Sequence, residues 1–182
     1  ELTYAQLAED AHHIVQVTGL REYHVFGFSD GGTAAYRLAA EDTRVRSVVT
    51  VGASWSGVRD ASVREMFENL SPALFRERMA DRVASYERLN PSPHLETLVD
   101  DLRHRWLDTT ETGYLNEHVS AIKVPVLAAR GENDFLFSLQ ELAELREHLP
   151  EAHLMNVPFA SHEAISEQTG IIWAAMKTMY GL

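Results

Sequence analysis

A serine stands between a strand-like and a helix-like stretch in residues 27–32, which read Gly-Phe-Ser-Asp-Gly-Gly. The preceding residues 23–26 are aromatic and β-branched, which is typical of a buried strand, and the alanine-rich residues that follow favour a helix. In this setting Gly-x-Ser-x-Gly forms a sharp turn that lifts the hydroxyl of Ser29 above a sheet, where it can act as a nucleophile. We expect Gly27 and Gly31 to let the strand and the helix approach closely, because neither has a Cβ atom. The same spacing also arises by chance in glycine-rich turns, so the flanking elements are what favour a nucleophile.

Two further side chains could complete the chemistry of Ser29. Asp134 follows a strand-like run, and His162 follows another one further along the chain. Because the carboxyl ends of parallel strands meet at one edge of a sheet, these side chains should lie near the serine. His162 would then act as a general base, and Asp134 would orient its imidazole. Alone, such an aspartate is usually a turn residue and such a histidine usually lies on the surface. The three residues in this order indicate a catalytic triad.

These side chains need a sheet whose strands all end at one edge. The chain alternates strand-like and helix-like stretches, and β-α-β units of this kind give parallel strands with right-handed crossovers. We therefore predict an α/β fold, with a parallel sheet of four strands flanked by helices. Strands are predicted at residues 23–26, 45–51, 124–129 and 152–157, and helices at residues 4–18, 33–40, 62–69, 72–89, 93–107, 139–149 and 163–180.

The stretch between the second and third strands has no strand-like run and contains several helical stretches. We expect it to form a cap over the active site, with a core of residues 1–54 and 121–182 and a cap of residues 55–120. A plain surface subdomain would give the same pattern. Large apolar residues of this stretch, such as Phe67 and Trp106, could line an acyl pocket, but we expect most of them to pack the stretch itself.

The motif at residues 27–32, the run Gly-Glu-Asn-Asp at residues 131–134 and the pair Ser161-His162 together resemble the α/β-hydrolase fold family, in the form of serine hydrolases and esterases with a helical cap. The resemblance covers the whole chain but only the C-terminal part of the family's fold. It implies the last four of eight strands, with the first strands and the loop that supplies one oxyanion N–H lying upstream. Ser161 departs from the family's pattern, in which a glycine commonly precedes the catalytic histidine.

The resemblance implies a serine hydrolase that cleaves a small ester, amide or related acyl substrate through an acyl-enzyme. Ser29, Asp134 and His162 would be catalytic, the backbone N–H of Asp30 would be one oxyanion donor, and Phe28, Asp30 and Trp55 would contact substrate. A C–C bond hydrolase or a cofactor-free perhydrolase could use the same triad, and a non-catalytic ligand-binding member of the family or a truncated one is the alternative of another class. A serine rather than a carboxylate at the nucleophile position argues against dehalogenase chemistry.

The side chain of Asp30 has two interpretations. An acidic residue in the first turn of a helix is stabilised by the helix dipole and needs no other purpose. If the carboxylate instead faces the pocket, its natural partner is an ammonium group of the substrate. Some esterases that resemble this family carry Ser-Asp-Gly-Gly here and act on amino-acid esters. The second interpretation therefore predicts a preference for esters with a free amine near the carbonyl.

Composition excludes several other classes of function. The 182 residues carry a net charge of −11, which argues against a nucleic acid or an anionic membrane as partner. There is no cysteine, and the nine histidines show no metal-ligand spacing, so we expect neither a metal site nor a cofactor. No apolar run reaches the length of a membrane span. We expect a cytoplasmic protein with a small-molecule acyl substrate. The strand at residues 23–26 would be an unpaired sheet edge, through which two copies of the chain could associate as a homo-oligomer.

Overall fold

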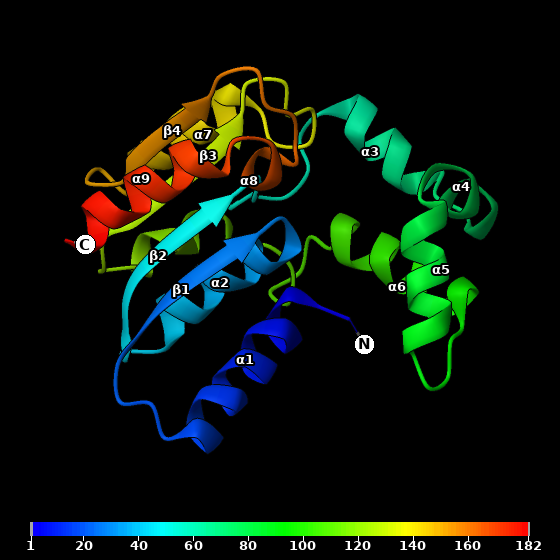
Figure 1. Cartoon of the computed structure of the whole chain (residues 1–182), viewed down its shortest axis with the longest axis horizontal. Coiled ribbons are helices and arrows are strands. Elements are labelled where there is room, and N and C mark those ends of the chain that lie inside the picture. The colour runs from blue at the N-terminus through cyan, green and yellow to red at the C-terminus, as the bar shows by residue number, and fades with distance from the viewer. Residues whose placement is uncertain (1, 182) are drawn as a thin grey trace.

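Four strands, β1 (Tyr23–Phe28), β2 (Val45–Val51), β3 (Val126–Gly131) and β4 (His153–Val157), form one parallel sheet in this spatial order (Figure 1). The computed structural model describes residues 2–181. The two inner strands, β2 and β3, are buried along almost their whole length because each has a strand on either side. Their valine and alanine content is what a strand covered on both faces requires. The predicted α/β class and the four parallel strands are confirmed.

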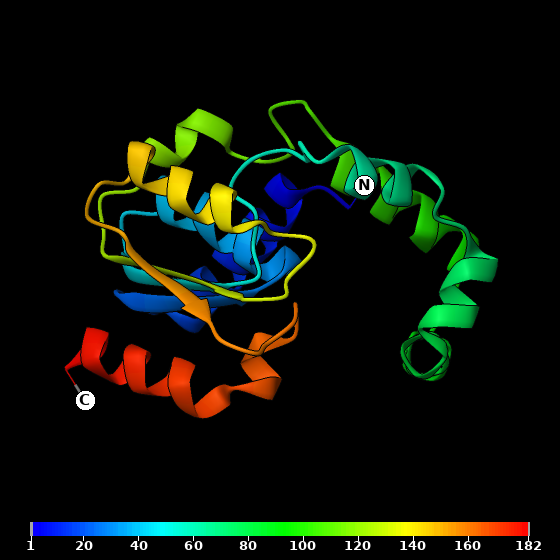
Figure 2. The same ribbon diagram turned by 90° about the horizontal axis from the view of Figure 1, so that it is seen from above.

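Helices cover both faces of the sheet. One face carries α2 (Asp30–Glu41), α7 (Leu139–His148) and the 3-10 helix η1 (Asn116–Ala121), while α1 (Tyr4–Thr18) packs on α2. The other face carries α8 (Ala164–Glu167) and α9 (Thr169–Tyr180); Figure 2 shows α9 across the sheet from α7. The expected helix at residues 163–180 is in fact these two helices, separated at Gln168.

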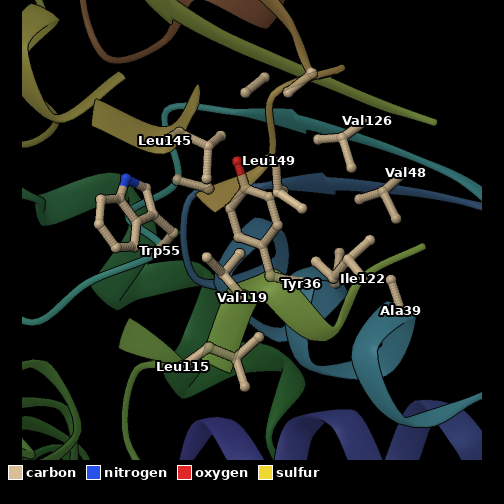
Figure 3. Close-up of a cluster of buried hydrophobic side chains, with 14 of the residues drawn as sticks. Tyr36, Ala39, Val48, Trp55, Leu115, Val119, Ile122, Val126, Leu145 and Leu149 are labelled. Carbon is tan, nitrogen blue, oxygen red and sulfur yellow. The ribbon is translucent and has the colours of Figure 1, made fainter. Parts of the chain in front are cut away.

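The main hydrophobic core lies between the sheet and its first helical face. Tyr36 of α2 is at its centre, and its hydroxyl makes a 2.7 Å hydrogen bond with the hydroxyl of Thr50 on β2. Figure 3 shows the side chains around it, from the sheet, α2, α7 and the segment that contains η1. The labelled members are Tyr36, Ala39, Val48, Trp55, Leu115, Val119, Ile122, Val126, Leu145 and Leu149.

Four helices between β2 and β3 stand beside this core and are called here the helical segment, residues 61–107 (Figures 1 and 2). They are α3 (Ala61–Glu68), α4 (Pro72–Arg78), α5 (Ala80–Leu89) and α6 (Leu95–Leu107). The segment has a small hydrophobic cluster of its own, formed by Val83, Leu95 and Val99 with Leu70, Phe75 and Leu98 packed against it.

Side-chain caps explain where several helices begin. Thr3, Asp60, Ser71 and Ser138 each accept a hydrogen bond from a backbone N–H in the first turn of the following helix. The expected helix at residues 72–89 is broken at Met79, whose φ of −132° lies outside the helical range.

The boundaries expected for a cap, residues 55 and 120, do not coincide with the packing. Trp55 and the residues around η1, which the sequence analysis did not identify as helical, belong to the main core. Between β2 and β3, the residues that form a hydrophobic cluster separate from that core belong to the helical segment.

Candidate active site

Ser29 sits in the turn between β1 and α2 with a backbone conformation that few residues adopt. Its φ is 52° and its ψ is −125°, a strained combination that costs on the order of 1–3 kcal/mol for a residue with a side chain. Its backbone N–H still donates to the carbonyl of Val51 on the neighbouring strand, 2.9 Å away. Its side chain does not cap α2, so the hydroxyl is available to another group.

Glycines allow the backbone to close up around this turn, although not both of the expected ones. A Cβ atom at Gly27 would lie 2.4 Å from the carbonyl oxygen of Gly31, and one at Gly32 would lie 2.4 Å from the Cβ of Ala53. The close approach expected at Gly27 is therefore confirmed. The expectation for Gly31 is wrong, because a Cβ there would meet nothing within 4 Å among the described residues outside its own helix and its chain neighbours. Gly32 has that role.

The structure brings Ser29, His162 and Asp134 together in a chain of hydrogen bonds. The Oγ of Ser29 lies 3.0 Å from Nε2 of His162. On the other side of the ring, Nδ1 lies 3.1 Å from both carboxylate oxygens of Asp134. The side chain of Asp134 is 0% exposed and that of His162 is 16% exposed. The hydrogen-bonded series is therefore open to solvent only at the end nearest Ser29. This geometry suits proton transfer from the serine to the imidazole.

The carboxylate of Asp134 is fixed by the loop that follows β3. It accepts hydrogen bonds from the backbone N–H groups of Leu136 and Phe137, at 2.9 and 3.2 Å. The loop is itself held by Arg130, the buried penultimate residue of β3. The guanidinium donates to the carbonyls of Asp134 and Phe137, at 2.7 and 2.6 Å, and to Oδ1 of Asn156, at 2.7 Å.

The loop that carries His162 crosses directly over the end of β3. A Cβ at Gly131 would collide with the carbonyl oxygen of Ser161, so the glycine makes room for this crossing. Ser161, which departs from the family's usual glycine, is tied to Glu167: its N–H and its hydroxyl each donate to that carboxylate at 2.6 Å. These two bonds lower the pKa of Glu167.

Phe28 packs its ring against that of His162, with 5.2 Å between centroids, and so supports the imidazole.

A cavity lies beside Ser29 and His162 and contains about 450 Å³ of empty space, part of it open to solvent. Sheet loops and the helical segment both contribute to its wall. No sequence motif marks Tyr4, Val58, Tyr114 or Leu136. Of these residues, only Leu136 had a signal in the sequence, its nearness to Asp134. Phe67 and Trp106 line the cavity rather than only packing the helical segment. The apolar and aromatic wall is formed by Tyr4, Val58, Phe67, Trp106, Tyr114 and Leu136.

Trp55 does not reach this cavity, so the expectation that it contacts substrate is wrong. It is 5% exposed and lies in the main core (Figure 3). Its indole N–H donates to the carbonyl of Glu141 at 2.9 Å, and its ring packs on His148. A buried indole needs such a partner, and Glu141 supplies it from α7.

Asp30 lines the cavity, but its carboxylate is occupied by the protein. It accepts hydrogen bonds from the hydroxyl of Tyr4, at 2.9 Å, and from the indole N–H of Trp106, at 2.9 and 3.1 Å. Nη1 of Arg105 lies 3.1 Å from the second oxygen. Burial, and secondarily the charge of Asp30, raises the pKa of Tyr4 well above its ordinary value, so this phenol is a neutral donor. Neither interpretation from the sequence included a cation supplied by the chain itself, and the preference for an amine-bearing substrate stays a prediction.

Two further features that would point to another function are metal-binding clusters and helices that could cross a membrane. Between residues 2 and 181, no group of three or more His, Cys, Asp or Glu side chains is placed to hold a metal ion. Among the helices of the same residues, none combines the length and the apolar character that crossing a membrane requires.

Comparison with known proteins identifies the family. The family model described as "alpha/beta hydrolase fold" matches residues 1–97, which is more than half of the chain. The chain therefore belongs to the alpha/beta hydrolase fold family, as its motifs indicated, and this membership supports a hydrolase. A search of curated proteins finds no match.

Solved structures of several enzymes share the fold. A bromoperoxidase from Bacillus anthracis is 17% identical, with a TM-score of 0.76 over 99% of this chain and 75% of that one. A meta-cleavage product hydrolase from Pseudomonas fluorescens is 18% identical, with a TM-score of 0.76 over 100% and 72%. A carboxylesterase structure from Nitrososphaera gargenis is 16% identical, with a TM-score of 0.70 over 99% and 72%. At these identities the likeness shows the fold alone.

Proposed function

We propose that this protein is a serine hydrolase that cleaves a small carboxylic ester, amide or related acyl substrate. The observation that carries the proposal is the hydrogen-bonded series from Ser29 Oγ through His162 to Asp134, with distances of 3.0 and 3.1 Å. A serine hydroxyl is a weak nucleophile unless a neighbouring base removes its proton, and this arrangement provides one. The cavity beside the serine gives room for a small acyl group.

In the proposed reaction the Oγ of Ser29 attacks the substrate carbonyl while Nε2 of His162 takes its proton. Asp134 holds the ring by Nδ1 and stabilises the imidazolium that forms. The tetrahedral oxyanion accepts a hydrogen bond from the backbone N–H of Asp30. Asp30 is the first residue of α2, and the first N–H groups of a helix have no acceptor within it. The imidazolium then gives its proton to the leaving alcohol or amine, which leaves an acyl-enzyme. Water, activated by the same imidazole, releases the acid and restores Ser29.

The helical segment is proposed to act as the cap over this site. Phe67 of α3 and Trp106 of α6 lie on the cavity wall, while Ser29 and His162 belong to the sheet core. In this proposal the chemistry resides in the core, and the helical segment shapes the space that the acyl group occupies.

Covalent labelling tests the proposal. A fluorophosphonate probe should modify the folded wild-type protein at Ser29, located by mass spectrometry of the labelled peptide, and the label should be lost in Ser29→Ala. The matched control is Ser120→Ala, an exposed serine of η1 outside the cavity, which should keep the label. A parallel assay with p-nitrophenyl acetate should show a burst of about one product molecule per site. A folded protein that takes no label, or that labels equally in Ser29→Ala, would refute the proposed serine chemistry.

A further inference from the structure

The carboxylate next to the nucleophile joins three parts of the chain. Asp30 belongs to α2, its partner Tyr4 belongs to α1, and its partners Arg105 and Trp106 belong to α6 of the helical segment. We call these four side chains the Asp30 clamp. The clamp therefore fixes the helical segment against the turn that carries Ser29, on the wall of the cavity.

The carboxylate has little capacity left for another partner. Its two oxygens already receive the Tyr4 hydroxyl, the Trp106 N–H and the Arg105 guanidinium. An ionised carboxylate has about four acceptor positions, and these contacts occupy them. The side chain remains 29% exposed, so it still faces the cavity with its charge.

Burial and several contacts hold the side chain of Arg105 in place. Its side chain is 6% exposed, its Nε donates to the carbonyl of Leu2 at 2.7 Å, and its guanidinium carbon lies 5.8 Å from the centre of the Tyr4 ring. A substrate ammonium that approached Asp30 would have to compete with this cation and would be repelled by it. Apart from Ser29, His162 and Asp30, the cavity is lined by aromatic and aliphatic side chains, by Gly52 and by the uncharged polar residues Thr33 and Ser54.

We propose that the Asp30 clamp makes the acyl pocket selective for uncharged acyl groups, and that Arg105 is the residue that sets this selectivity. The proposal rests on the proposed hydrolase function and specifies its substrate class. Without the positive charge of Arg105, the carboxylate of Asp30 would face the cavity unneutralised and would attract an ammonium group beside the reacting carbonyl.

A matched pair of esters measures this selectivity. Ethyl propionate and alanine ethyl ester differ by one amino group next to the carbonyl, and at about pH 6.5 most of that amine is protonated. Acid release is followed by pH-stat and corrected for hydrolysis without enzyme. The readout is the ratio of kcat/KM for the amino ester to that for the propionate. Wild type should favour the propionate.

Two variants separate charge from structure. Arg105→Gln removes the cation and should raise the ratio by about tenfold or more, since an unpaired and partly desolvated carboxylate then faces the ammonium. Arg105→Lys keeps the positive charge but loses the planar guanidinium, and it should keep the wild-type ratio. Fluorophosphonate labelling of each variant reports whether the reacting groups are intact.

The outcomes are distinct. A wild type that favours the amino ester overturns the proposal even if neither variant folds. An equal rise in the ratio for both variants, or no rise in Arg105→Gln that still takes the label, also overturns it, and neither result affects the proposed hydrolase function. Failure of the wild type to take the label refutes the hydrolase function itself, and the substrate class with it.

Discussion

The α-carbon of Gly52 lies directly against the imidazole of His162. A Cβ atom at this position would be 3.0 Å from Cε1 and 3.1 Å from Nδ1 of the ring, and 3.2 Å from Oδ2 of Asp134. Gly52 follows the last residue of β2 and has a φ of 59°, which disfavours any residue with a side chain. The end of β2 thus packs directly against the side chains of His162 and Asp134.

Gly52→Ala should therefore impair the reaction although it removes no reacting group. The added methyl would push the imidazole by a few tenths of an ångström and would strain a backbone with positive φ. Since a misplacement on the order of 1 Å can cost about a hundredfold in rate, a smaller shift should cost less but remain measurable. We expect kcat to fall by about tenfold or more, measured with p-nitrophenyl acetate. Gly170→Ala is the control, because a Cβ at that helical position would meet no atom of residues 2–181 within 4 Å, apart from its own helix and chain neighbours. Unchanged kcat in Gly52→Ala would contradict the packing described here.

The triad variants should show that its members act as a unit. Ser29→Ala and His162→Ala should each lower kcat by roughly 10³-fold or more, and the double variant should be no worse than either. Asp134→Ala should lose less, because the base itself remains. Steady-state kinetics on purified, folded variants gives these values, and losses that multiply in the double variant would mean that the two residues act independently.

Arg130 should matter for both stability and rate, because it holds the loop that bears Asp134. Arg130→Met leaves the buried carbonyls of Asp134 and Phe137 without their donor, at about 1–3 kcal/mol for each. We expect lower stability in urea unfolding together with lower kcat. Asn156→Ala, which removes only the third partner of the guanidinium, should have a much smaller effect on both. A less stable Arg130→Met with wild-type kcat would restrict Arg130 to a structural role.

Asp42, far from the cavity, should make stability depend on acid pH. Hydrogen bonds from Arg44, with a further one from the Tyr23 hydroxyl, outweigh its burial and hold the pKa of its carboxyl well below the ordinary value; His12 also contacts it. A lowered pKa means that the stabilisation is present at neutral pH and is lost as pH falls below about 4 and the carboxyl is protonated. Asp42→Asn should thus lower the free energy of unfolding at pH 7 by about 1.5–3 kcal/mol.

The same comparison at lower pH provides the check. As pH falls from about 4 to about 2, the difference between wild type and Asp42→Asn should shrink, because the wild type loses the interaction too. Urea unfolding at several pH values measures it. A difference that stays constant over this range would show that the charge of Asp42 does not stabilise the fold.

The sequence was sufficient to place Ser29, Asp134 and His162 together, because each follows a separate strand and a parallel sheet brings those ends to one edge. It could not reveal the partner of Asp30, since Arg105 is 75 residues away and meets it only through the tertiary position of α6. The break at Met79 was missed because a favourable helical composition continues across it. Trp55 was expected in the pocket because it lies close to the end of β2 in the sequence. The sequence does not show that its indole N–H donates to the carbonyl of Glu141, which lies in α7.

The small separate cluster of Val83, Leu95 and Val99 implies that the helical segment can open locally at a lower free energy than global unfolding. In hydrogen-exchange experiments, amides of α5 and α6 should then exchange earlier than those of β2 and β3. Such opening would carry Trp106 and the outer cavity wall away while the hydrogen bonds of His162 stay in place. Ligand entry would then be a breathing motion of the less stable half of the pocket, and its frequency would depend on how firmly Asp30 holds α6.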